Sequence, residues 1–179
     1  MDNDPPRIEV VYTAEDIQRR ISVLARDVAA RCGEELIVVA ILKGSFVFAA
    51  DLIRAMHASG LSPDVDFLTL SSYGKDKTSK GSVTIVRDVD VNVAGRNILI
   101  VDDILESGRT LAFARDLLVE RGAKSALTCV LLDKPNKRVL PFMADFRGFE
   151  CPDLFVVGYG MDLAYRYREL PFVGHVVNR

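Results

Sequence analysis

The sequence predicts an α/β fold in which a central, mostly parallel sheet is flanked by helices. Three apolar runs, at residues 36–42, 98–101 and 125–132, are short and rich in β-branched side chains, as buried parallel strands are. Helical patterns follow the first two runs, and alternation of strands with helices is typical of a parallel sheet. The chain has 179 residues, of which 49% are hydrophobic, so we expect a single domain over residues 1–179 with a substantial core.

The N-terminal part of the chain predicts an edge strand followed by a long helix. Residues 8–12 are a short apolar segment suited to such a strand. Thr13 is a candidate N-cap, and Asp16 stands three residues later, in the place of the acid of a capping box. We therefore expect a helix over residues 14–31, which Gly33 can end. The predicted buried face of this helix consists of Ile17, Ile21, Leu24 and Val28.

The middle of the chain predicts a strand, a helix and a hairpin. After the strand at 36–42, a glycine turn leads into a helical pattern at 46–56. Residues 65–70 and 83–87 are further strand patterns. The polar, lysine-rich segment between them, at about residues 71–82, is a predicted loop, so the two strands would form a long hairpin.

The last part of the chain predicts one more helix and three more strands. A helical pattern at 111–121 precedes the buried strand at 125–132. Residues 141–149 have no clear period, and we expect them to be irregular. Short strands at 154–157 and 172–177 would follow, and we expect the chain ends to form a small hood over the main sheet.

Composition and charge narrow the class of protein. The formal net charge of −2 argues against nucleic-acid binding as the main function. The cysteines Cys32, Cys129 and Cys151 lack C-x-x-C spacing, so neither a zinc site nor a disulfide framework is predicted, and Cys129 is a predicted core thiol. The acidic, proline-rich start differs from a signal peptide and no apolar stretch is long enough to span a membrane, so we expect a cytoplasmic protein.

The segment from Asp102 to Thr110 carries the strongest functional signal, because it lies between a predicted strand and a predicted helix. A glycine-containing loop at a helix start offers backbone N–H groups and the positive end of a helix dipole, which suit a phosphate. The predicted phosphate site consists of Ser107, Gly108, Arg109 and Thr110. The acidic pair Asp102 and Asp103 suits sugar hydroxyls or a Mg²⁺ ion that bridges to them. One ligand with both a phosphate and a polyol would satisfy the whole segment.

This segment resembles the phosphoribosyl-diphosphate (PRPP) signature of the type I phosphoribosyltransferases. It shares an apolar strand, two acidic residues, two apolar residues, one variable residue and then Ser/Thr-Gly-x-Thr. The resemblance extends over nearly the whole chain, and residues 148–159 are typical of the branch that acts on 6-oxopurines, the hypoxanthine and hypoxanthine-guanine phosphoribosyltransferases. It implies purine salvage, in which Mg²⁺-dependent transfer from PRPP to N9 of hypoxanthine, and also guanine, releases diphosphate.

The same resemblance implies roles for residues elsewhere in the chain. The residues implied for the leaving diphosphate are Lys43, Gly44 and Arg168, with a cis peptide bond before the lysine. The residues implied for the purine are Lys134 as donor to O6 and N7, Phe155 as stacking partner and Val156 through its backbone. The carboxylates implied for Mg²⁺ are Asp162, Asp102 and Asp103. The loop at about residues 71–82 would be a lid, with Ser72 and Tyr73 near its base.

Glu106 is the implied catalytic base, and here the chain departs from the family pattern. The family usually has aspartate at this position, so the acid is retained on a side chain that is longer by about 1.5 Å. Its carboxylate would accept the purine N–H proton and oppose the positive charge that grows on the ribose.

Two alternatives stay open at the level of sequence. One is an RNA-binding transcription attenuation regulator that retains the PRPP site, against which the acidic pI of about 5.7 speaks weakly. The other is a phosphoribosyltransferase for adenine, orotate or uracil. We expect the chain to form a homodimer or a homotetramer.

Overall fold

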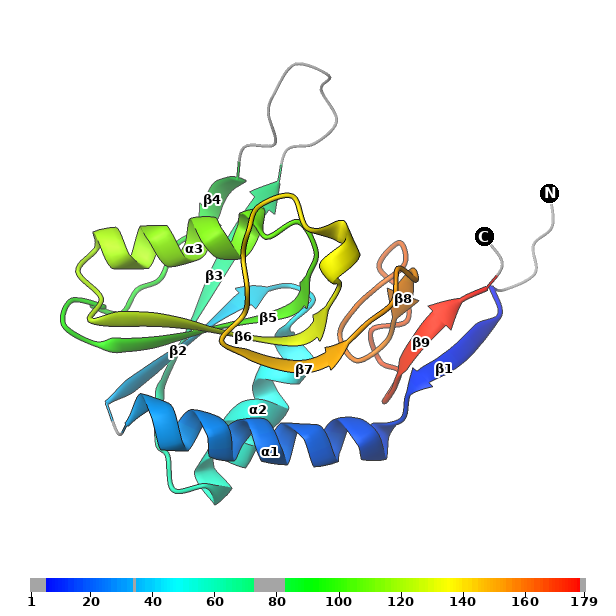
Figure 1. Ribbon diagram of the computed structural model, residues 1–179, viewed down its shortest axis with the longest axis horizontal. Helices are drawn as coiled ribbons and strands as arrows, with labels where there is room; N and C mark the ends of the chain where they lie inside the picture. Colours follow the sequence, from blue (N-terminus) through cyan, green and yellow to red (C-terminus); the bar gives the residue numbers. More distant parts are fainter. Residues whose placement is uncertain (1–5, 34, 73–82, 178–179) are drawn as a thin grey trace, which may run out of the picture.

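The computed structural model describes residues 6–33, 35–72 and 83–177, and its centre is a six-stranded sheet (Figure 1). The strand order is β4 (Val83–Arg87), β3 (Asp64–Ser72), β2 (Leu36–Leu42), β5 (Asn97–Leu105), β6 (Ser125–Asp133) and β7 (Phe146–Glu150). Neighbouring strands are parallel except β3 and β4, which form the predicted antiparallel hairpin. The predicted α/β fold with a mostly parallel sheet is confirmed.

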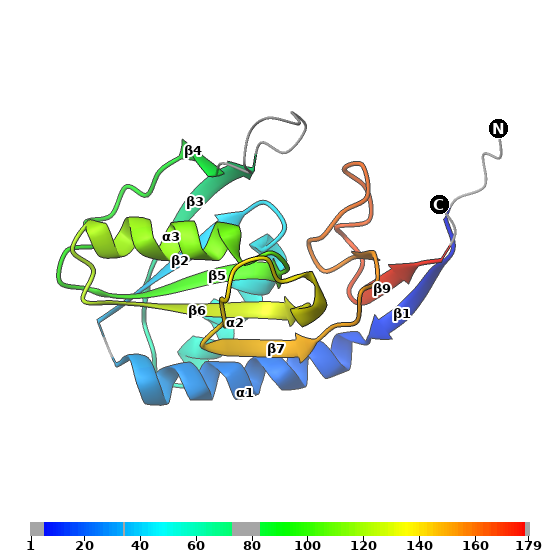
Figure 2. The same ribbon diagram turned by 45° about the horizontal axis from the view of Figure 1, so that its top comes forward.

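Helices cover both faces of this sheet. α1 (Ala14–Cys32) and α2 (Phe46–Ala58) lie on one face and α3 (Arg109–Glu120) lies on the other, as Figures 1 and 2 show. Each face has its own cluster of buried apolar side chains, with Leu24 and Leu52 in the first and Leu118 in the second. The capping box between Thr13 and Asp16 is present at the start of α1, as predicted.

The strands in the middle of the sheet are buried on both faces. Residues 36–41 of β2 and 98–102 of β5 are buried throughout, which explains why they stand out as unbroken apolar runs. β5 continues to Leu105, beyond the predicted end at residue 101, because Asp102, Ile104 and Leu105 still pair with β6. The acidic pair therefore lies within the strand rather than after it.

A second, three-stranded sheet forms the predicted hood. It pairs β1 (Ile8–Tyr12) with β9 (Val173–Val176), and β9 with β8 (Val156–Val157). Figure 1 places this hood beyond the carboxyl ends of β6 and β7. The predicted strand at 154–157 was too long, because Leu154 donates its N–H to the carbonyl of Pro152 in a turn.

The prediction that residues 141–149 are irregular was wrong in its second half, because β7 pairs with β6 in parallel. Gly148 lies in the middle of β7, and a glycine inside so short a segment favours a loop in a reading of the sequence. A Cβ atom at this position would lie 2.4 Å from the carbonyl oxygen of Leu131, so the glycine serves close approach of two backbones. Cys129 is fully buried in β6, which confirms it as a core thiol.

The helices of the described residues include none with the length and apolar character needed to cross a membrane.

Candidate functional site

The carboxyl ends of β2, β5 and β6 border a cavity of about 910 Å³, which the hood closes on one side. Ligands of open α/β sheets bind at this edge of the sheet. The cavity is lined by most of the predicted site residues: Lys43, Gly44, Asp102, Asp103, Glu106, Ser107, Gly108, Thr110, Lys134, Phe155, Val156, Asp162 and Arg168. Segments far apart in the chain thus meet in one place.

Asp102 and Asp103 lie near the end of β5, where Asp102 is only 7% exposed. Burial raises the pKa of both carboxyl groups, and the neighbouring charge of Asp103 raises the pKa of Asp102 further. Carboxylates in such a place are stabilised when hydroxyl groups or a cation approach them. The pair therefore suits a sugar diol, or a cation held beside one.

Residues 106–108 form the turn between β5 and α3. Gly108 has a φ of 83°, in the left-handed region that favours glycine, and Ser107 Oγ accepts the N–H of Arg109 at 3.2 Å. α3 begins at Arg109 rather than at residue 111, so Arg109 and Thr110 belong to its first turn. Among the described residues, the backbone N–H groups of Ser107 and Gly108 have no acceptor, which leaves them for an anion at the helix start.

The Lys43-Gly44 turn after β2 lies directly against the acidic pair. A Cβ atom at Gly44 would come within 1.8 Å of Asp103 Oδ2, so any larger residue here would displace the Asp103 carboxylate. The peptide bond between Leu42 and Lys43 is cis, as the family resemblance implies. The backbone of this turn and the Asp103 carboxylate therefore share one side of the cavity.

Lys134 directly follows β6 and is 5% exposed. Its Nζ donates to Glu106 Oε1 at 2.8 Å and to the carbonyl oxygen of Leu154 at 2.9 Å. An ammonium group has three N–H donors, so one donor remains for a ligand. The implied base and the implied purine-selecting lysine are thus ion-paired.

The hood supplies the other side of the cavity. Phe155 is 39% exposed, and its neighbour Val156 is buried in β8. Asp162 pairs with Arg168 at 2.8 Å and accepts the backbone N–H of Tyr165 at 2.7 Å. Both charged side chains are therefore held in place by the protein.

Three predicted site residues are not placed in the cavity wall. The side chain of Arg109 is exposed and does not line the cavity, although its backbone begins α3. Ser71 and the backbone of Ser72 belong to β3, so the predicted lid loop starts two residues too early. The side chain of Ser72 and residues 73–82, Tyr73 among them, lie outside the described residues. Sequence reasoning missed Leu154, whose carbonyl holds Lys134, and Tyr165, which lines the cavity, and no motif signals either residue.

The donor set fits a magnesium ion that is shared with a substrate. Asp102, Asp103 and Asp162 all line the cavity, yet no three Asp, Glu, His or Cys side chains of the described residues form a metal-binding group by themselves. Mg²⁺ commonly keeps several waters and is bound by one or two carboxylates together with substrate phosphates. Carboxylates beside a phosphate turn suit that mode of binding.

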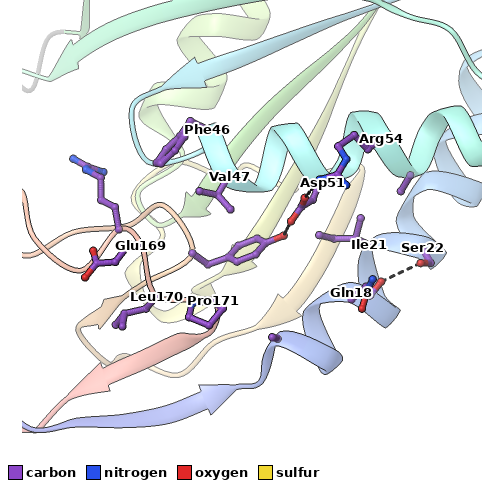
Figure 3. Close-up of a pocket in the computed structure, with 14 residues that line it drawn as sticks. Gln18, Ile21, Ser22, Phe46, Val47, Asp51, Arg54, Glu169, Leu170 and Pro171 are labelled. Atoms are coloured by element: carbon purple, nitrogen blue, oxygen red, sulfur yellow. Dashed lines mark hydrogen bonds and ion pairs between the residues drawn. The ribbon is translucent and has the colours of Figure 1, made fainter.

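A second cavity, of about 920 Å³, lies between α1, α2 and residues 168–171 (Figure 3). Its wall includes the apolar residues Ile21, Phe46 and Leu170, and Asp51 in this wall accepts the hydroxyl of Tyr159 at 2.5 Å. The described residues that line it include neither an acidic pair nor a glycine turn at a helix start. The chemistry expected from the sequence therefore belongs to the first cavity.

Comparisons with known proteins agree with this geometry. The family model of the phosphoribosyl transferase domain matches residues 11–164. The hypoxanthine phosphoribosyltransferase of Salmonella typhimurium is 44% identical over 173 residues, which cover 95% of this chain and 96% of that protein. The hypoxanthine-guanine phosphoribosyltransferase of Bacillus subtilis is 42% identical, with 93% and 91% covered. A crystal structure of a hypoxanthine-guanine phosphoribosyltransferase from Bacillus anthracis matches with a TM-score of 0.88 at 40% identity, covering 97% of this chain and 100% of that one.

Proposed function

The chain belongs to the phosphoribosyl transferase family and is a phosphoribosyltransferase of purine salvage; from this premise we propose that it transfers the phosphoribosyl group of PRPP to N9 of hypoxanthine, with the help of Mg²⁺, and that it also accepts guanine. The observation that carries the proposal is the ion pair between the buried Lys134 and Glu106, which lies in the same cavity as the phosphate turn. A selector for the base and an acceptor for its proton are thus held beside the place for the ribose phosphate.

Selection of the base rests on Lys134. Two of its N–H donors are bonded to Glu106 and Leu154, so the third would donate to the purine O6. An ammonium group cannot accept a hydrogen bond, so a 6-amino purine would leave a buried donor facing a donor. Hypoxanthine and guanine share O6, so this contact accepts both. The exposed part of Phe155 offers an aromatic face for stacking.

Binding of PRPP rests on the phosphate turn, the Lys43-Gly44 turn and the acidic pair near the end of β5. The N–H groups of Ser107 and Gly108, with the hydroxyl of Thr110, would hold the 5′-phosphate at the start of α3. Asp102 and Asp103 would accept hydrogen bonds from the ribose hydroxyls. On the other side of the cavity, the Lys43-Gly44 turn and Arg168 would bind the diphosphate, whose charge grows as it leaves.

The proton that leaves the purine would go to Glu106. As diphosphate departs, C1′ of the ribose gains oxocarbenium character, and a nearby carboxylate opposes that positive charge. Lys134 occupies Oε1, and in the described part of the chain Oε2 has no hydrogen-bond partner, so Oε2 is the oxygen that would take the proton. The lysine thus orients the carboxylate as well as the base.

The proposed role of Mg²⁺ rests on three carboxylates that line the cavity. Asp162, with Asp102 and Asp103, would hold the ion, which would supply positive charge to offset that of the diphosphate. A cytoplasmic location and a homodimeric or homotetrameric assembly stay predictions from the sequence.

A screen of free bases with PRPP and Mg²⁺ tests the proposal. Hypoxanthine, guanine, xanthine, adenine, orotate and uracil are incubated separately, and the nucleoside monophosphate and diphosphate are measured together. We expect stoichiometric products from hypoxanthine and guanine. Turnover of adenine in preference to both 6-oxopurines would overturn the proposal, and so would absence of turnover with every base.

A further inference from the structure

Arg138 connects segments that meet behind the phosphate turn. It follows the short helix η1 (Pro135–Lys137), and its side chain is 16% exposed. Its Nη1 donates to the carbonyl oxygens of Leu105, at 3.1 Å, and of Glu106, and its Nη2 donates to a carboxylate oxygen of Asp133. The Asp133 side chain is 8% exposed. A guanidinium is a planar, always charged fork, so it can bridge a carboxylate and two carbonyl groups at once.

Backbone groups of the same segment bind the neighbouring carbonyls. The carbonyl oxygen of Ser107 accepts the N–H groups of Val139 and Leu140, each at 3.0 Å. The carbonyl oxygen of Leu105 also accepts the N–H of Lys134, at 2.9 Å. The three successive carbonyls of residues 105–107 therefore all face the segment 134–140.

This anchoring decides the direction of the phosphate-binding amides. In a trans peptide unit the C=O group and the next N–H group point in opposite directions. When the carbonyls of Glu106 and Ser107 face Arg138 and its neighbours, the N–H groups of Ser107 and Gly108 face the other way. Those two residues line the cavity, and their N–H groups have no acceptor among the described residues.

We propose that Arg138 is a positioning residue, which aims both the amides of the phosphate turn and the Glu106 carboxylate at the substrate through its bonds to the Leu105 and Glu106 carbonyls. Arg138 does not line the cavity, so it acts through the turn rather than on the substrate. Without it, the Glu106 carbonyl loses its partner and the peptide unit that precedes Ser107 is free to rotate. The part that concerns Glu106 rests on the proposed function, whereas the part that concerns the amides needs only phosphate binding.

Substitution of Arg138 with Met and with Lys separates positioning from stability. Arg138→Met removes the guanidinium, and we expect affinity for ribose 5-phosphate to fall about 10-fold and kcat to fall about 10- to 100-fold, as displacements of about 1 Å do. Arg138→Lys keeps a positive charge beside Asp133, so its Tm should approach that of the parent. A lysine cannot span both carbonyls and the carboxylate, so the losses of affinity and kcat should persist.

Arg147→Met is the matched control, because Arg147 is the other cation beside Asp133, with Nη1 3.4 Å from Oδ2, and contacts neither carbonyl. We expect it to keep parental kcat and phosphate affinity. Equal losses in Arg147→Met and Arg138→Met would overturn the proposal, since they would trace the effect to the charge on Asp133. Recovery of kcat in Arg138→Lys together with its Tm would overturn it as well.

A double-mutant cycle with Glu106→Gln tests the coupling to the carboxylate. If Arg138 acts through Glu106, Arg138→Met should lower kcat by no more than about 2-fold in the Glu106→Gln background. A loss as large as in the parent background would refute that coupling. Titration calorimetry with ribose 5-phosphate tests the amide part even for a chain that turns over no base. Parental affinity in the folded Arg138→Met and Arg138→Lys proteins would therefore refute the proposal independently of the proposed function.

Discussion

Replacement of Glu106 with Gln would test the proton acceptor in the proposed reaction. The change keeps the side-chain size and one oxygen that can accept from Lys134, whose Nζ lies 2.8 Å from Oε1 in the parent protein. It removes the negative charge and the ability to take a proton. The change leaves the groups proposed to bind PRPP in place, among them the N–H groups of Ser107 and Gly108 and the Lys43-Gly44 turn, so the KM for PRPP should stay close to its parental value.

The expected loss is in kcat, by about 10²–10⁴-fold, the usual range for removal of a general base. This corresponds to about 2.7–5.5 kcal/mol on the activation barrier. The effect on folding should be much smaller. Glu106 is 50% exposed while Lys134 is 5% exposed, and the glutamine oxygen still accepts from the ammonium. Because water screens the carboxylate, we expect the free energy of unfolding to fall by about 1 kcal/mol or less, which lowers Tm by about 2–4 °C in a chain of this size.

Initial rates with saturating hypoxanthine and varied PRPP measure both parameters, and thermal unfolding measures stability. Glu106→Asp shortens the side chain by about 1.5 Å and should restore most of the turnover, since the family usually uses aspartate at this position. Glu120→Gln, at the exposed end of α3, is the control for loss of one surface carboxylate. Parental kcat in Glu106→Gln would refute the assignment, and the proton would then have to pass to water or to a substrate phosphate.

Three further predictions follow from the cavity. Lys134→Gln places a group that accepts as well as donates opposite O6. The kcat/KM for hypoxanthine and guanine should therefore fall by the factor that corresponds to a loss of about 1–3 kcal/mol in transition-state stabilisation. Unchanged kinetics with both bases would show that Lys134 is not the O6 donor. Activity should vanish in EDTA and return with Mg²⁺ or Mn²⁺, and Asp162→Asn should weaken turnover or metal dependence without unfolding the domain; full activity in a metal-free assay would rule out the proposed role of the metal. Burial raises the pKa of Asp102 above its unfolded value of about 3.9, so above that pH the folded state binds more protons than the unfolded state, and the free energy of unfolding falls as pH rises toward neutrality. Asp102→Asn, measured in EDTA, should therefore raise Tm at pH 7 and make Tm depend less on pH. A Tm below that of the parent would contradict this.

The sequence by itself determined the features that depend on neighbours along the chain. Strands β2, β5 and β6 were predictable because burial on both faces requires unbroken apolar runs. The capping box of α1 and the strand–turn–helix around residues 102–110 were predictable because their residue types act within a few positions of one another. The predicted hood was confirmed, whereas β7 was missed, since Gly148 is selected by the nearby backbone of Leu131 rather than by its own neighbours in sequence.

Only the tertiary structure decided how the residues of the site are coupled. The sequence named Lys134 and Glu106 separately, but their ion pair depends on the parallel register of β5 and β6, which places Leu105 opposite Asp133. The same register brings Arg138 to the carbonyls of the phosphate turn, although nothing near Arg138 in sequence signals that contact. Hydrogen bonds and ion pairs act over a few ångströms of space, and folding alone decides which distant positions of the chain come within that range.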